Sequence, residues 1–124
     1  MQAISTPDAP LSIGPFSQAV QANGFIFVSG QVALDPATQK VVDGDVAAQA
    51  ERAILNVQAI LEAAGSSLKK VVRSGVYLRN MGDFAAMNAV YGRFFTAPYP
   101  ARTTIEVSRL PLDVLFEIDV VAVG

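Results

Sequence analysis

The sequence predicts an α+β fold, a two-layer sandwich in which two helices pack on one face of a single, mostly antiparallel β-sheet. Two segments, 46–64 and 84–96, repeat apolar residues at helical spacing. Around them lie shorter stretches rich in Val, Ile, Phe and Thr, several of which alternate apolar and polar side chains as half-buried strands do. In chain order these segments read ββ-α-β-α-ββ. At 124 residues, the chain is expected to form one domain, 1–124.

The first part of the chain predicts a flexible arm followed by a hairpin. Residues 1–10 are polar and contain prolines, so we expect a loosely held arm there. Gly14-Pro15 is typical of a turn. Asn23-Gly24 is a strong hairpin signal because both residues tolerate the positive φ of a type I′ turn. The two hairpin strands are expected at 19–21 and 25–28.

The helix at 46–64 is the clearest element. Asp43 and Asp45 are typical helix-start residues, and Gly65 is typical of a helix end. A second helix is expected after Asp83, which could cap it. The first helix carries one apolar stripe, made of Val46, Ala50, Ala53, Ile54, Val57, Ile60, Leu61 and Ala64.

Three more strands complete the predicted sheet. One covers residues 69–79. Pro98 and Pro100 end the second helix and force an extended entry into the next strand, which alternates over 102–108. The last strand follows at 114–123, and we expect it to adjoin the preceding one.

The composition predicts that part of the apolar surface is covered by another subunit. Hydrophobic residues make up 52% of the chain and charged residues 16%, where about 25% charged is typical of a soluble domain. With both helices on one sheet face, the other face would expose Phe27 or Val28 and one side of the last strand. Oligomerisation through the sheet is therefore expected.

Charge and missing residue types exclude several classes of function. A net charge of −2 provides no basic footprint for nucleic acid, and no apolar run approaches the roughly 20 residues that span a bilayer. The N-terminus lacks the features of a signal peptide, and there is no cysteine, so a cytoplasmic location is expected. Without His or Cys there is no imidazole base, no thiolate nucleophile and no ordinary zinc site.

Arg102 and Glu117 are the best candidates for a chemical site. In the last strand, Glu117 and Asp119 are the only charged side chains, and the strand period places them on one face. Arg102 can hold a carboxylate bidentately, and Glu117 can orient or deprotonate a water molecule. Structural interpretations remain open: Arg102 could form a surface ion pair, and Glu117 could pair with Arg109 or Arg73.

The sequence resembles the Rid (YjgF-type) family of reactive-intermediate deaminases from Pro10 to Val123. The segment from Arg102 to Asp119 is the most specific part of this resemblance. The motifs that carry it are Ile13–Ala19, Val28–Gln31, Asn88–Tyr91, Pro100–Thr103, Glu106–Pro111 and Glu117–Asp119.

The resemblance implies a chorismate-mutase-like fold and a homotrimer with its pockets between subunits. It implies hydrolysis of 2-imino acids and their enamines, such as 2-iminobutanoate and 2-iminopropanoate, to 2-oxo acids and ammonia, without a cofactor or metal. Arg102 and Glu117 would be catalytic. The substrate-binding residues would be Arg102, Ser29, Gly30, Phe16, Asn88 and Thr104, with a backbone carbonyl near Thr104 helping to place the water.

Several of these residues have simpler interpretations. Ser29-Gly30-Gln31 is typical of a bulge at a strand end, and Asn88 on a helix favours a backbone or loop contact. Many family members carry tyrosine where this chain has Phe16, so a hydroxyl that could bond substrate or water is missing.

Two other functions compete with the deaminase. One is a non-catalytic regulatory protein that binds small carboxylates in the same pocket. The other is ribonuclease or translation inhibition, which a pI near 4.9 and the lack of histidine make the weakest hypothesis.

Overall fold

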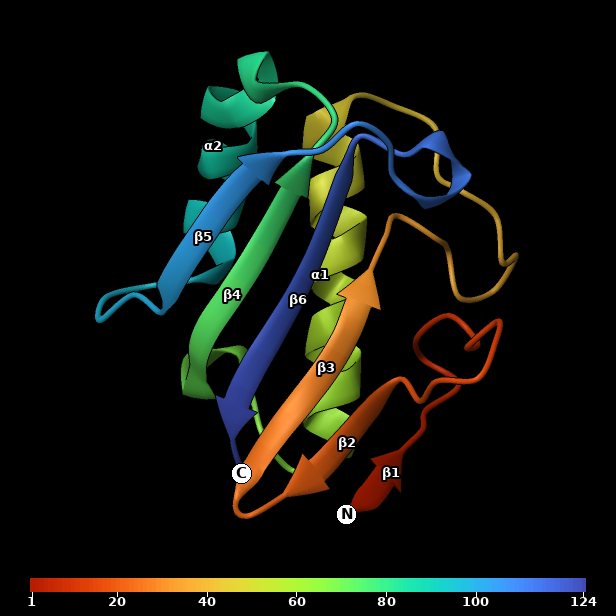
Figure 1. Ribbon diagram of the computed structural model, residues 1–124, viewed down its shortest axis with the longest axis vertical. Helices are drawn as coiled ribbons and strands as arrows, with labels where there is room; N and C mark the ends of the chain where they lie inside the picture. The colour runs from red at the N-terminus through yellow and green to blue at the C-terminus, as the bar shows by residue number, and fades with distance from the viewer.

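A six-stranded sheet carries both helices on one face in the computed structural model, which describes residues 1–124 (Figure 1). In the sheet the strands lie in the order β1-β2-β3-β6-β4-β5, and all neighbours are antiparallel except β4 and β5. The predicted fold class is confirmed. The elements are β1 (Gln2–Ile4), β2 (Ala19–Ala22), β3 (Phe25–Gln31), α1 (Val46–Ala63), β4 (Val71–Leu78), α2 (Phe84–Phe94), β5 (Ala101–Glu106) and β6 (Phe116–Val123).

Local signals set the ends of α1 as predicted. The Asp45 carboxylate accepts a hydrogen bond from the backbone N–H of Ala48 (3.1 Å). At the other end Gly65 has φ of 79°, and the N–H of Ser66 donates to the carbonyl of Leu61 (2.8 Å). Asp83 occupies the N-cap position of α2, as expected. Its side chain makes no capping hydrogen bond, so the prediction that Asp83 caps this helix is wrong.

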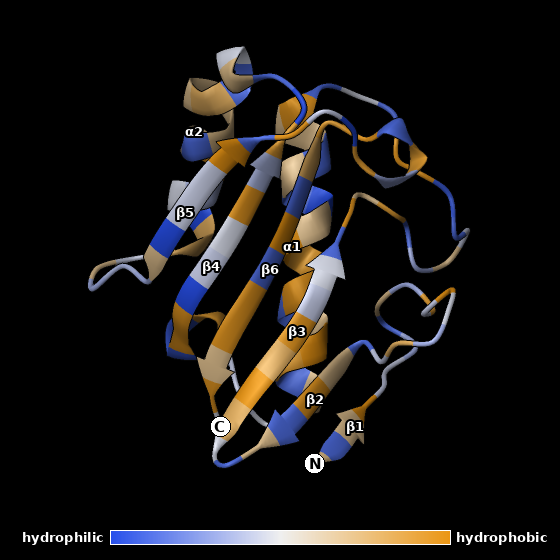
Figure 2. Ribbon diagram, viewed as in Figure 1, coloured by the Kyte–Doolittle hydropathy of each residue, from blue (hydrophilic) through white to orange (hydrophobic).

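The core lies between α1 and the sheet. Ile54, Val57 and Ile60 of α1 are fully buried together with Val76 of β4 and Ile118 of β6. Figure 2 shows apolar colour running along β3, β6 and α1 where these layers meet. Each such side chain contributes about 1.5–3 kcal/mol on burial, so the apolar stripe is what holds the helix to the sheet.

The N-terminal segment is not the loosely held arm that the sequence predicts. Gln2–Ile4 form β1 and pair with β2, with Gln2 opposite Gln21. Gln18 is 4% exposed, and its amide donates to the carbonyls of Thr6 (3.1 Å) and Pro10 (2.8 Å) while accepting from the N–H of Thr6 (2.8 Å). A strand of three residues is too short to show a recognisable alternation of polar and apolar side chains. The buried side-chain amide of Gln18 holds residues 6–10 in place.

We predict that Gln18→Ala lowers the free energy of unfolding by about 1–3 kcal/mol, because it leaves the buried N–H and carbonyls of residues 6–10 unpaired. Thermal unfolding followed by circular dichroism measures this. Gln58→Ala is the control, since Gln58 is half-buried on α1 and its side chain makes no hydrogen bond in the chain. Equal melting temperatures for the two variants would show that Gln18 does not fasten the segment.

The last two strands do not adjoin each other, contrary to expectation. β4 lies between β5 and β6, because the helical crossover through α2 lays β5 parallel to β4. β6 then pairs with β3 on one side and β4 on the other. Residue patterns within each strand carry no information on this order.

The face of the sheet away from the helices is uncovered and apolar, as predicted. Phe25 and Phe27 of β3 are 41% and 43% exposed, and Ile105 of β5 is 43% exposed. Of the two candidates named for this face, Phe27 lies on it, whereas Val28 is buried toward the helices. Neither helix has both the length and the apolar character needed to cross a membrane.

Candidate functional site

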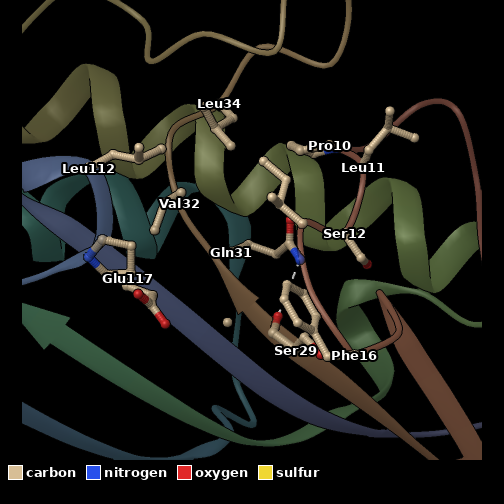
Figure 3. A pocket seen from close by; sticks show the side chains of 13 residues that line it. Pro10, Leu11, Ser12, Phe16, Ser29, Gln31, Val32, Leu34, Leu112 and Glu117 are labelled. Carbon is tan, nitrogen blue, oxygen red and sulfur yellow. Dashed lines mark hydrogen bonds between the residues drawn. The ribbon is translucent and has the colours of Figure 1, made fainter.

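A cavity of ≈ 590 Å³ lies where β3 and β6 meet the N-terminal segment and the turn before β6 (Figure 3). Four predicted site residues line it: Phe16, Ser29, Gly30 and Glu117. Glu117 is the only charged residue among the 13 that line the cavity. The remaining predicted site residues lie elsewhere.

A β-bulge places Ser29 and Gly30 at the cavity. The pairing of β3 with β6 shifts register between Val28 and Gln31, which confirms the bulge expected from the sequence. The Ser29 hydroxyl donates to the carbonyl of Ser17 (2.6 Å), and the Gln31 amide donates to the carbonyl of Ser29 (3.3 Å). The first bond ties the bulge to the N-terminal segment that walls the cavity, and the second lies within β3.

Glu117 is half-buried and has neither a hydrogen bond nor an ion pair in the chain. The two structural partners considered for it are engaged elsewhere: Arg109 pairs with Asp113 (3.3 Å), and Arg73 donates to the carbonyl of Ser74 (3.0 Å). The carboxylate lies against Gly30, where a Cβ would come within 3.0 Å of the Glu117 carboxyl carbon. Because Gly30 has no side chain, the Glu117 carboxylate can occupy this space.

Burial raises the pKa of Glu117 above its usual range, and the neighbouring charge of Asp119 raises it further. Asp119 accepts a hydrogen bond from the Tyr77 hydroxyl (2.8 Å). That bond, together with burial, raises the pKa of Tyr77. Glu117 therefore exchanges its proton at a higher pH than an ordinary carboxyl group, which suits a group that takes a proton from water.

Arg102 lies on β5, and its guanidinium stacks on aromatic rings of α2. Its Cζ is 4.6 Å from the ring centre of Tyr91 and 5.7 Å from that of Phe84. Tyr91 is held in turn by a hydrogen bond between its hydroxyl and that of Ser74 (2.7 Å). Arg102 takes part in no ion pair, so the surface ion pair considered from sequence is wrong. The guanidinium is oriented while its donors stay available.

Asn88 and Thr104 lie near Arg102 rather than in the cavity. Thr104 follows Arg102 by two residues on β5, so both side chains point to the same face. Asn88 lies on α2 between Phe84 and Tyr91, on the helix side that Arg102 contacts. The Asn88 side chain makes no hydrogen bond in the chain, so the structural contact expected for it is absent.

Arg102 and Glu117 lie on opposite faces of the sheet. Arg102 pairs in register with Ser74, which is buried against α2. Glu117 pairs with Tyr77, which in turn pairs with the exposed Ile105 on the uncovered face. The sequence prediction that adjoining strands bring the arginine and the carboxylate together is therefore wrong within one chain. They form two candidate half-sites, each with an unpartnered charge.

The sequence pattern of the family described as endoribonuclease L-PSP matches residues 6–124. This match covers both half-sites and nearly the whole chain. The chain belongs to the Rid (YjgF-type) family. The resemblance seen in the sequence motifs is thereby confirmed.

Relatives of this Rid protein match it over nearly its full length. A RutC family protein of Pyrococcus horikoshii is 50% identical over 98% of this chain and 96% of its own. A 2-iminobutanoate/2-iminopropanoate deaminase of Dermatophagoides farinae is 41% identical over 97% of this chain and 94% of its own. The crystal structure of Escherichia coli TdcF with bound serine superimposes with a TM-score of 0.95 at 39% identity, covering 100% of this chain and 99% of that one.

Sequence reasoning missed two features of this Rid protein's half-sites, the aromatic support of Arg102 and the apolar wall of the cavity. Tyr91 belongs to the apolar repeat over 84–96, which predicts core packing, and it is buried, but it also supports Arg102. Phe84 belongs to the same repeat, yet it is 38% exposed beside the same guanidinium. The apolar wall of the cavity, which includes Leu11 and Leu112, carried no sequence signal because exposed leucines in loops have no periodic pattern.

Proposed function

We propose that this Rid protein hydrolyses 2-imino acids, such as 2-iminobutanoate and 2-iminopropanoate, to 2-oxo acids and ammonia. The observation that carries the proposal is the pair of half-sites: an unpartnered carboxylate in a cavity and an unpartnered, aromatic-stacked arginine. These groups suit the two ends of a 2-imino acid, its electrophilic C=N carbon and its carboxylate. The naming of one relative as an imino acid deaminase supports the same reaction.

A complete site on this proposal requires two subunits. Since Arg102 and Glu117 lie on opposite faces of one sheet, Arg102 of one copy would face the Glu117 cavity of another. Such a contact joins two different surfaces, and heterologous contacts form a ring when the rotation between copies closes. We propose a homotrimer, the assembly that the family resemblance implies. The apolar uncovered face with Phe25 and Phe27 supports burial of this surface against further copies.

The reaction can proceed with water and side chains alone. Arg102 holds the substrate carboxylate through two parallel N–H···O bonds. Glu117 takes a proton from water as the water oxygen bonds to C2, the C=N electron pair moves to nitrogen, and nitrogen takes that proton from Glu117. In the resulting carbinolamine, the hydroxyl proton is transferred to nitrogen, the C–N bond breaks, ammonia leaves and the oxygen becomes that of the carbonyl. Because positioning alone accelerates such additions greatly, no strong nucleophile is needed.

Neither the charge nor the cavity supports the ribonuclease activity after which the family is described. No basic residue lines the cavity, and the net charge is −2.

We also propose a cytoplasmic location for the protein. There it would meet the imines that pyridoxal-phosphate enzymes release from serine and threonine.

A coupled assay tests the function. A threonine dehydratase generates 2-iminobutanoate, and its loss is followed with and without this protein. Accelerated loss is expected; binding of 2-oxobutanoate without any acceleration would instead identify a regulatory carboxylate-binding protein. Sedimentation near the monomer mass of 13.1 kDa at micromolar concentration would contradict the trimer and the site between subunits.

We predict that Asp119→Asn moves the acid limb of the pH–rate profile to lower pH. The base form of Glu117 is required, so the rate rises as pH increases through its raised pKa. Removing the Asp119 charge lowers that pKa, while Tyr77 can still donate to the amide oxygen of the asparagine. Asp43→Asn, at an exposed position outside the cavity, should leave the limb in place. An unmoved limb in Asp119→Asn would exclude Glu117 as the titrating group.

A further inference from the structure

A buried asparagine of α1 holds the backbone that follows the β-bulge of β3. Asn56 is 0% exposed, and its side-chain Nδ2 donates to the carbonyls of Val32 (3.2 Å) and Leu34 (2.9 Å). Its Oδ1 accepts hydrogen bonds from Nε (3.2 Å) and Nη2 (2.8 Å) of Arg52, one turn earlier on the helix. Every donor and acceptor of the Asn56 amide is therefore engaged, and Arg52 fixes which end of the amide faces β3.

The same helix holds the neighbouring strand through a second amide. Gln49 lies two turns before Asn56, on the same face of α1, and it is also buried. Its Oε1 accepts a hydrogen bond from the N–H of Leu115 (2.7 Å), the residue that leads into β6. Since β3 and β6 are neighbours and α1 crosses behind both, one helix holds the two strands that carry Gly30 and Glu117 (Figure 1).

The position of the bulge decides whether the Glu117 carboxylate has room. In the bulge, Ser29 and Gly30 together lie opposite one residue of β6. Gly30 lies against Glu117, at a place where a Cβ would come within 3.0 Å of the carboxyl carbon. A bulge shifted by one residue would bring Ser29 or Gln31 to this place, and each of these carries a side chain. Glu117 would then have to turn away toward solvent.

Side-chain hydrogen bonds on both sides of the bulge fix its position. A bulge can move along a strand without changing the pairing beyond it, so the ladder bonds alone do not decide where it lies. On one side, the Ser29 hydroxyl donates to the carbonyl of Ser17 (2.6 Å). On the other side, Asn56 holds the carbonyls of Val32 and Leu34. Moving the bulge toward the end of β3 would displace both of these carbonyls from a buried donor.

We propose that Asn56 is a positioning residue for Glu117. By holding the two carbonyls after the bulge, it fixes the bulge at the place that leaves Gly30 beside the carboxylate. Gln49 assists by holding the start of β6, on which Glu117 is the second residue. Neither amide lines the cavity, so both act through the backbone. This inference rests on the proposed imine hydrolysis, in which Glu117 takes a proton from water.

Asn56→Leu tests the inference, because leucine nearly preserves the size of the side chain and removes the amide. The kcat for 2-iminobutanoate should fall about tenfold or more, since a misplacement of about 1 Å caused far from the chemistry can cost about 10²-fold. Calorimetric affinity for 2-oxobutanoate should stay near the parental value, because Arg102 belongs to the other half-site.

A titration of the Glu117 carboxyl group by carbon NMR provides a measurement that does not depend on activity. In Asn56→Leu the pKa of Glu117 should move down toward that of an ordinary carboxyl group, because the displaced group loses the burial that raises it. Asp119 and Tyr77, the titratable neighbours of Glu117, are unchanged in this variant and remain hydrogen-bonded to each other. The shift therefore reports the burial of Glu117.

Ser66→Ala is the matched control. Ser66 is also buried, and its hydroxyl donates to the carbonyl of Val123 (2.7 Å), at the opposite end of β6 from Glu117. This variant should lower the melting temperature, as Asn56→Leu does, but should keep the parental kcat and the parental pKa of Glu117. If Asn56→Leu also keeps both values, Asn56 only stabilises the fold and the inference is overturned.

Gln49→Met keeps the inference testable if Asn56→Leu does not fold, because methionine has a similar length and lacks the acceptor for the N–H of Leu115. The kcat should fall about threefold or more, and the pKa of Glu117 should again move down. A parental kcat and pKa in a folded Gln49→Met would contradict the inference. If the parent protein accelerates no imine, the proposed function fails, whereas the NMR titration still decides whether α1 positions Glu117.

Discussion

Arg102→Ala should lower kcat/KM for imine hydrolysis by about a hundredfold or more, which corresponds to roughly 3 kcal/mol of lost charge-assisted binding. The planar guanidinium is already oriented by Tyr91 and Phe84, so its two donors meet a carboxylate without further ordering. Arg102→Lys should restore little of this activity, since an ammonium is a point charge without the paired donors. Steady-state kinetics on 2-iminobutanoate measure both variants.

The control for Arg102 is Arg93→Ala. Arg93 lies on α2, forms an exposed ion pair with Glu51 (3.3 Å) and stacks on Phe94. Because exposed ion pairs contribute about 0–1 kcal/mol, activity and melting temperature should stay near the parental values. If Arg102→Ala instead dissociates or unfolds the protein, Arg102 is a structural residue and its assignment to the substrate carboxylate fails.

Glu117→Gln should lower kcat by about 10²-fold or more while sparing the binding of 2-oxo acids, because general bases contribute roughly 10²–10⁴-fold. The substitution nearly preserves size and leaves the space beside Gly30 filled. Single-turnover kinetics and calorimetry with 2-oxobutanoate separate the two effects. Full activity in Glu117→Gln would show that another group handles the water.

The same substitution has a predictable effect on stability. Since the folded protein raises the pKa of Glu117, the folded state favours the protonated form, and that contribution is lost as pH rises through the raised pKa. At pH 7 Glu117→Gln should therefore melt at or above the parental temperature. Below the ordinary carboxyl pKa of about 4.3 the difference should vanish, because both side chains are then neutral. Glu62→Gln, exposed on α1 and outside the cavity, is the control, and it should melt at the parental temperature at pH 7.

Much of this fold follows from local chemistry and was therefore predictable. Asp45 and Gly65 bound α1 through backbone hydrogen bonds formed within one turn. Asn23 and Gly24 form the hairpin turn with φ of 52° and 80°, and the bulge at Ser29-Gly30 is found where expected. Each of these features depends on residues close together in the chain.

The relative position of the two half-sites could not be predicted from local sequence patterns. The low charge of the chain and the chemistry of the two side chains favour Arg102 and Glu117 as site residues, and both are unpartnered in the folded chain. Their placement on opposite faces depends on the register in which β5 and β6 each pair with β4, because Arg102 pairs with a residue that faces the helices and Glu117 with one that faces away. The fastening of residues 6–10 by Gln18 likewise joins segments that only the fold brings together.

By itself, the sequence determined the two-layer architecture, the ends of α1, the family and the two charged residues proposed for the chemistry. These depend on periodicity, turn and cap residues, and residue type, which are readable along the chain. Only the tertiary structure decided the strand order, the faces on which Arg102 and Glu117 lie, and the apolar wall of the cavity. Those features arise from contacts between distant segments, where the burial of each side chain depends on what the rest of the chain packs against it.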